Sequence, residues 1–274
     1  MHPLFKNRIA ALATMHAKEQ IIAPILAEQL GMQVQVAAVN TDLFGTFTGE
    51  IERQGTQRHA ARLKCEAAIR QTGYPIGLAS EGSFGPHPTV PFVAANCEMV
   101  MLVDTQLGIE VCGEYFTTET NFSQKSVTSV EQALEFADNV GFPAHGLIVR
   151  TQPIVKGIRD YETLTHAVSK GLAASGAVWI ETDMRAMHNP TRCKAIAAAV
   201  ADLVARLSAL CPQCSKPGFG KGKAIVGLPC SWCGLPTQQP KGYTLECPTC
   251  GYAEEVLSKE HQEADPAFCS FCNP

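Results

Sequence analysis

The chain has 274 residues, of which 46% are hydrophobic and 18% charged, and its formal net charge is −4. This is an ordinary globular composition, and the length predicts one large domain with a small one beside it. The negative balance argues against a nucleic-acid-binding surface that covers the whole molecule.

Apolar periodicity and Gly or Pro punctuation predict alternating helices and strands in the first three quarters of the chain. The predicted elements, in chain order, are a helix over 18–30, strands over 33–39 and 76–79 with a helix over 56–71 between them, paired strands over 99–104 and 109–116, a helix over 130–140, a strand over 147–150, a helix over 161–174, a strand over 177–180 and a helix over 191–210. We expect Gly/Pro-rich loops over 40–55 and 80–91. The alternation predicts an α/β domain with a mixed central sheet and flanking helices.

Cysteine usage divides the chain near residue 209. Four cysteines are scattered singly through the first part, whereas the other eight lie in Cys-x-x-Cys pairs from residue 211 onward, where Pro and Gly are also frequent. We therefore predict two domains, residues 1–209 and residues 210–274. The N-terminal segment does not resemble a signal peptide, and no apolar run approaches the ~20 residues of a membrane span, so we expect a cytoplasmic protein without membrane contact.

The paired cysteines predict a double zinc ribbon with two structural Zn²⁺ ions, since two such pairs complete one tetrahedral shell. The eight ligands are Cys211, Cys214, Cys230, Cys233, Cys247, Cys250, Cys269 and Cys272. Fifteen residues separate the first pair from the second and eighteen the third from the fourth, whereas thirteen lie between the second and third. The usual ribbon spacing therefore favours consecutive pairing, with a crossed arrangement as the alternative. A closed site of four thiolates leaves no position for catalysis.

Four polar segments of the first domain predict an active site at the strand ends. They are residues 14–18, 41–52, 80–87 and 181–192. Their carboxylates suit Mg²⁺, and their cations suit phosphate groups, as phosphoryl transfer requires. The candidate residues are Glu81 and Asp183 as catalytic carboxylates, Glu50 and Glu81 as magnesium ligands, and Thr14, Lys18, Arg62, Arg185 and Arg192 for the substrate. His16, His87, His145 and His188 are further candidates for proton transfer without an assigned role. Each residue also has a plain structural alternative, such as a helix cap or a surface ion pair.

As a whole, the chain resembles a bacterial family of unknown function that combines an α/β domain with C-terminal zinc knuckles. The resemblance rests on GTFTGE at 45–50, SEGSFGPHP at 80–88, ETDMRAMHNPTR at 181–192, CPQCSKPGF at 211–219 and GLPCSWCGLPT at 227–237. It implies the domain organisation but no activity.

Residues 8–205 also resemble, more distantly, the inosine/xanthosine triphosphatase fold. The matching features are TMHAK at 14–18, Glu50 and Glu52 before the Ala/Arg-rich helix segment HAARLK at 59–64, the acidic turn LASEG at 78–82, and Thr191-Arg192 before the last helix. The resemblance implies a nucleotide-pyrophosphatase-like fold in which Lys18 and Arg192 hold phosphates and Glu50 and Glu81 bind Mg²⁺. Met15 and His16 depart from the Asn and Pro of the family's turn.

Two functions follow from the sequence. The first is Mg²⁺-dependent hydrolysis of a nucleotide or another phosphorylated small molecule, at the phosphoanhydride bond. The alternative is a non-enzymatic zinc-ribbon protein that binds nucleic acid or a protein partner, because lysines and aromatic residues lie in the ribbon loops.

Overall fold

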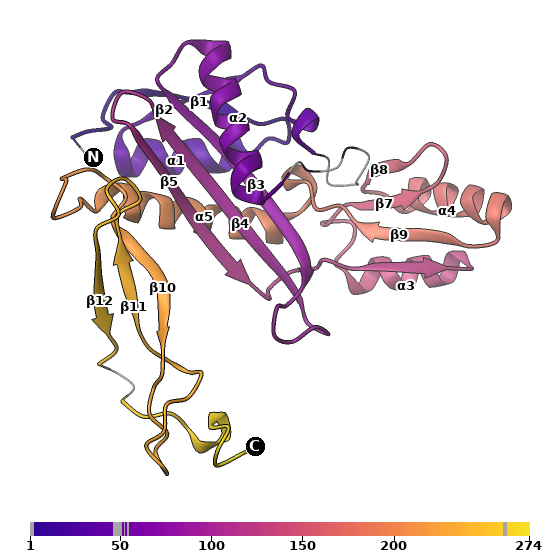
Figure 1. Ribbon diagram of the computed structural model, residues 1–274. Coiled ribbons are helices and arrows are strands. Elements are labelled where there is room, and N and C mark those ends of the chain that lie inside the picture. The colour runs from indigo at the N-terminus through magenta and orange to yellow at the C-terminus, as the bar shows by residue number, and fades with distance from the viewer. Residues whose placement is uncertain (1–2, 46–50, 52, 54, 260–261) are drawn as a thin grey trace. The chain divides into compact units, whose positions relative to one another are not determined.

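The structure is a computed structural model that describes residues 3–45, 51, 53, 55–259 and 262–274 (Figure 1). The chain forms two compact units: residues 1–104 with 112–204, and residues 105–111 with 205–274. The first unit is mixed α/β with a central mixed sheet and flanking helices, which confirms the predicted class.

The central sheet has five strands in the order β2-β1-β3-β4-β5. Strand β1 (Ile9–Ala13) runs parallel to β2 (Gln33–Ala37) and to β3 (Ile76–Pro86). Strand β3 pairs antiparallel with β4 (Ala94–Asp104), and β4 neighbours β5 (Ile109–Thr117). Parallel pairing requires crossover helices, and the chain supplies α1 (Glu19–Leu30) and α2 (Gln57–Thr72).

The predicted loop over 80–91 is largely wrong, because β3 continues to Pro86 and pairs residue by residue with β4 as far as Ala94. The Gly and Pro content of this segment favours a loop locally, but the long antiparallel partner satisfies its backbone groups. Two 11-residue strands result, and they carry Ser80 to Phe84 as strand residues.

Close-packed helices cover both faces of the central sheet. Gly77 of β3 lies under α2, where an added Cβ would come within 2.5 Å of the Cys65 carbonyl oxygen. On β5, Cys112 belongs to the buried cluster of α2, and the next residue, Gly113, has room only for hydrogen because the backbone of α5 (Pro190–Ser208) lies against it. Successive strand residues face opposite sides, so α2 and α5 cover opposite faces.

The first unit also contains a four-stranded antiparallel sheet in the order β6-β9-β7-β8. Its strands are β6 (Gln124–Val127), β7 (Leu147–Arg150), β8 (Val155–Ile158) and β9 (Val178–Thr182). Helices α3 (Val130–Asn139) and α4 (Tyr161–Ser175) pack on it through a separate apolar cluster that includes Phe136, Leu147 and Val168. Short 3₁₀ turns, η1 (Thr41–Phe44) and η2 (Ala186–His188), precede α2 and α5.

The second unit contains an antiparallel sheet of β10 (Gly220–Val226), β11 (Pro240–Glu246) and β12 (Ala253–Leu257), followed by η3 (Pro266–Phe268). No helix among the described residues is long and apolar enough to cross a membrane.

Candidate functional site

The eight paired cysteines form two groups that could each hold a metal ion, consistent with zinc. One contains Cys211, Cys214, Cys247 and Cys250 (the first quartet), and the other contains Cys230, Cys233, Cys269 and Cys272 (the second quartet). The sulfurs of Cys211 and Cys250 lie 3.7 Å apart, and those of Cys230 and Cys272 lie 3.9 Å apart. Four sulfurs at about 2.3 Å from one tetrahedral ion would be about 3.8 Å from each other, so both quartets have the dimensions of a zinc site.

The favoured consecutive pairing is therefore wrong, and the crossed alternative is correct. The reason is the antiparallel sheet between the knuckles (Figure 1). The chain runs out along β10, back along β11 and out again along β12, which places the first and third knuckles at one end and the second and fourth at the other. A strand of 7 residues spans about 23 Å, far more than the 4.8 Å within which the ligand atoms of each quartet lie.

A cavity of about 360 Å³ lies in the first unit, where the carboxyl end of β1 and the middle of β3 meet residues of the second sheet. Thr14 follows β1, and the chain turns through His16 to Lys18, the residue directly before α1. Five cations and three carboxylates line the cavity among the described residues: Lys18, Arg53, Lys64, Arg150, Arg192, Asp42, Glu81 and Glu181. Its wall is thus strongly charged, with the cations in excess.

Among the five cations, Lys18 is the one that forms no ion pair within the described part of the chain. Its side chain is buried, and its Nζ donates to the Ser80 carbonyl oxygen at 2.8 Å and contacts the Ser80 hydroxyl at 3.4 Å. Burial, followed by the nearby Arg192 guanidinium, lowers the Lys18 pKa to about 7. Around neutral pH this amine is therefore close to the midpoint of its titration, in a place that would favour a bound anion.

Glu81 lies in β3 between two cations. Its carboxylate contacts Lys64 Nζ of α2, and Arg53 Nη2 lies 3.6 Å away. Arg53 also donates to the Gly82 carbonyl oxygen at 2.8 Å. The carboxylate is mostly buried, so it meets both cations inside the wall of the cavity.

Arg192 enters the cavity from the first turn of α5. Asn189 accepts a hydrogen bond from the Arg192 backbone N–H at 2.9 Å, so Asn189 is the N-cap of this helix. The guanidinium donates Nε to Glu98 Oε1 at 2.8 Å and Nη2 to Oε2 at 3.3 Å, and Nη1 donates to the Met184 carbonyl oxygen. Gly82 leaves room for this ion pair, because an added Cβ would come within 2.4 Å of Arg192 Nη2 and the guanidinium would have to shift.

Two aromatic rings form the less polar side of the cavity. Phe84 and Phe122 have ring centroids 5.8 Å apart, and the Arg192 guanidinium carbon lies 5.0 Å from the Phe84 centroid. Nearby, Glu181 of β9 accepts from Arg150 Nε at 3.0 Å through Oε2, whereas its buried Oε1 has no hydrogen-bond partner among the described residues.

The structure brings together four of the described candidate residues, namely Thr14, Lys18, Glu81 and Arg192, since all line the cavity. Asp183 and Arg185 do not line it. The fully buried Asp183 carboxylate binds the Arg185 guanidinium and accepts the Gly157 backbone N–H at 3.0 Å. The catalytic role of Asp183 and the substrate role of Arg185 stay predictions.

The other candidates have separate positions. Arg62 is exposed on α2 and does not line the cavity, and Glu50 lies outside the described residues. Of the four candidate histidines, His16 lines the cavity, where burial and then Lys18 lower its pKa to about 4, so it is neutral at pH 7.

Sequence reasoning missed several residues of this wall, above all Lys64. A signal was present, because Lys64 shares the buried face of α2 with Ala61, Cys65 and Ala68. A lysine on an apolar helix face needs a buried partner, and here the partner is Glu81.

The family model described as a domain of unknown function (DUF6671) matches residues 64–274. This is well over half of the chain, and the chain therefore belongs to that family. No curated protein matches the chain.

Proposed function

We propose that this member of the family hydrolyses a phosphoanhydride bond of a nucleotide, or of another phosphorylated small molecule, in the cavity of the first unit. The observation that carries the proposal is the buried Lys18 amine, which binds only the uncharged oxygens of Ser80 within the described part of the chain. Arg192 and Lys64 line the same cavity. A phosphate group would supply the missing negative charge and accept several charge-assisted hydrogen bonds.

The carboxylate of Glu81 is the proposed catalytic group. In the proposed step a water oxygen attacks phosphorus, its proton passes to Glu81, and the bond to the bridging oxygen breaks. Lys18 and Arg192 would stabilise the charge on the phosphate oxygens, which is the main contribution that a protein makes to such a reaction. Asp183 has a positioning role in this scheme, since it fixes Arg185 and the Gly157 backbone.

The residues present fit a magnesium ion bound together with the substrate. Mg²⁺ commonly uses one or two carboxylates and completes its shell with phosphate oxygens and water. Glu81 and Glu181 would hold it, and the buried Glu181 Oε1, which has no hydrogen-bond partner in the described part of the chain, supports this assignment. When bound, the ion would neutralise charge on the transferred phosphate.

The aromatic side of the cavity favours a nucleotide among phosphorylated compounds. A nucleobase could stack on Phe84 or Phe122, and such stacking contributes about 1–3 kcal/mol per base. The proposed phosphate roles of Lys18 and Arg192 are also those that the triphosphatase resemblance implies.

The two quartets are the proposed sites of structural Zn²⁺. Each would have four thiolate ligands and no open position, so the ions would stabilise the second unit and take no part in hydrolysis.

The test is hydrolysis of a panel of nucleoside triphosphates and diphosphates with Mg²⁺, with release of phosphate and pyrophosphate measured for wild type and variants. Glu81→Gln should lower kcat about 100-fold, and Lys18→Ala should raise KM roughly tenfold or more. Glu135→Gln and Lys170→Ala, both on exposed helix positions, are matched controls that should leave the rates unchanged. If no nucleotide is bound or hydrolysed, the proposal is wrong.

A second candidate function is partner binding by the zinc-ribbon unit without enzymatic activity. The observation in its favour is the aromatic surface of that unit, with Trp232 78% exposed. Such binding would use the second unit, whereas the proposed hydrolysis would use the cavity of the first unit.

A further inference from the structure

The second quartet carries exposed aromatic residues at equivalent positions of its two knuckles. Trp232 directly precedes the ligand Cys233 and is 78% exposed, and Phe271 directly precedes the ligand Cys272 and is 71% exposed. Phe268, which precedes Cys269, is 58% exposed. All three rings therefore belong to residues adjacent to ligands of one metal centre.

The first quartet is an internal comparison for this feature. The equivalent knuckle positions there are Gln213 and Thr249, which are polar. Its aromatic neighbours, Phe219 and Tyr252, pack inward against the ligand cysteines, with ring centroids 5.9 Å apart. A metal knuckle of this kind is thus complete without outward aromatic rings, and folding does not explain those of the second quartet.

The knuckle does not depend on these rings for its own structure. Its interior contains the buried Leu228 and Ala264, and the Ala264 backbone N–H donates to the Pro229 carbonyl oxygen at 2.7 Å. The buried Thr237 hydroxyl donates to the Leu228 carbonyl oxygen at 2.7 Å. Large apolar side chains that are exposed in the free protein and become buried when a partner binds are the usual anchors of an interface.

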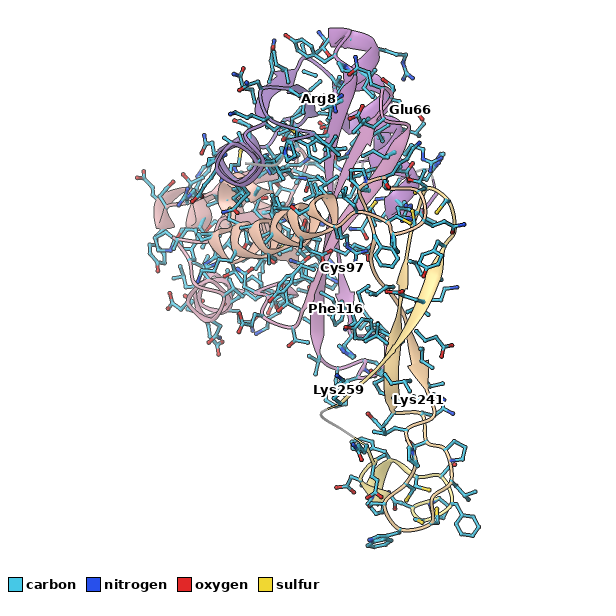
Figure 2. All side chains as sticks on the ribbon, turned by 90° about the vertical axis from the view of Figure 1, so that its left-hand side faces the viewer. Arg8, Glu66, Cys97, Phe116, Lys241 and Lys259 are labelled. Atoms are coloured by element: carbon cyan, nitrogen blue, oxygen red, sulfur yellow. The ribbon has the colours of Figure 1, made fainter. Side chains whose placement is uncertain are left out.

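The charge around the rings indicates the kind of partner. Residues 227–240 and 262–274 contain no lysine or arginine, but they include the exposed Glu263 and Asp265. A zinc ion with four thiolates would add two further negative charges. Lys241 and Lys259, labelled in Figure 2, lie at the neighbouring end of the sheet and outside these segments.

We propose that Trp232, Phe268 and Phe271 form a docking surface for a protein segment in which arginine or lysine alternates with apolar residues. The rings would receive the apolar side chains and the faces of guanidinium groups, and Glu263 would pair with the cations. Nucleic acid fits this surface poorly, because stacked bases bring phosphates that need cations beside the rings. The proposal does not rest on the hydrolase function.

The test uses the full chain with both metal ions bound and fluorescein-labelled 12-residue peptides, measured by anisotropy at 150 mM salt. One peptide alternates arginine and leucine, a second alternates glutamate and leucine, and the third probe is a 12-nucleotide oligothymidine. The key variant combines Trp232→Gln and Phe271→Thr, which copies the knuckle residues of the first quartet. Its metal content, measured beside that of the wild type, should stay at two ions per chain.

We expect saturable binding of the arginine peptide, with a Kd roughly tenfold or more below those of the other two probes. The double variant should weaken this binding roughly tenfold or more while it keeps its metal, and Glu263→Gln should weaken it about threefold. Equal or tighter binding of oligothymidine or of the glutamate peptide would overturn the proposal. An unchanged Kd in the double variant would also overturn it, as would concentration-dependent dimers that the double variant abolishes.

Discussion

The crossed pairing of the cysteines predicts how metal content changes when two ligands are removed at once. Cys211→Ser with Cys247→Ser disables the first quartet only, so the chain should keep one ion. Cys211→Ser with Cys230→Ser disables one ligand in each quartet, so the chain should keep none. Consecutive pairing predicts the reverse for both double variants.

The loss should be complete, since few large apolar side chains beyond residue 210 are buried among the described residues. After residue 210 the buried side chains outside the ligands include Phe219 and Leu228 as the large apolar members. Their burial contributes about 3–6 kcal/mol together, whereas a structural zinc ion contributes about 10–16 kcal/mol of folding free energy at pH 7. Three remaining thiolates cannot replace a closed shell, and the affected knuckle should unfold.

The assay is metal content per chain by mass spectrometry after dialysis against a weak chelator, with a thiol count under native conditions. Single variants such as Cys230→Ser should hold one ion and serve as the control for both doubles. If Cys211→Ser with Cys247→Ser retains no ion while Cys211→Ser with Cys230→Ser retains one, the antiparallel-sheet argument is refuted.

Three further predictions concern the first unit. Lys18→Met should raise the free energy of unfolding, and the gain should be largest below pH 7. Between pH 7 and 10.5 the unfolded chain holds a proton that folded Lys18 has lost, so wild-type stability rises with pH. In urea titrations, the advantage of the variant over the wild type should therefore shrink by roughly 2–3 kcal/mol from pH 6 to pH 9. Glu98→Gln should cost about 3–5 kcal/mol in the same titrations, because the fully buried Glu98 is the ion-pair partner of Arg192, and a cost below 1 kcal/mol would contradict that role. Gly77→Ala should destabilise by about 1–3 kcal/mol because its Cβ would meet the main chain of α2, whereas Gly85→Ala on the same strand, with nothing within 4 Å, should be nearly neutral in thermal melts.

Local signals predicted the helices well. Gly31 and Gly73 end α1 and α2 with positive φ angles of 70° and 74°, as their positions after apolar runs indicate. Thr56 accepts a hydrogen bond from the His59 backbone N–H at 3.2 Å and begins α2 where the sequence predicts it. These features depend on residues only a few positions away in the chain, so a single sequence is enough to predict them.

Features set by distant partners were not predictable in the same way. Ser80 to Pro86 is a strand because β4 lies beside it, and Glu98 holds the cavity residue Arg192 although the two are 94 positions apart. The predicted pairing of the cysteines was wrong for the same reason, since the number of residues between two knuckles does not indicate how the strands between them are arranged. The cavity residues at strand ends, such as Thr14, were accessible to prediction because strand ends gather at one edge.

The crossed quartets also affect the order in which the second unit can form during synthesis. The sulfurs of Cys214 and Cys247 are 33 positions apart, and those of Cys233 and Cys269 are 36 apart. The first centre cannot close until Cys250 has left the ribosome, by which time the second knuckle already lies inside its loop. Each centre therefore closes a loop that contains half of the other, and an emerging chain exposes up to six unmetallated thiols before its first ion is enclosed.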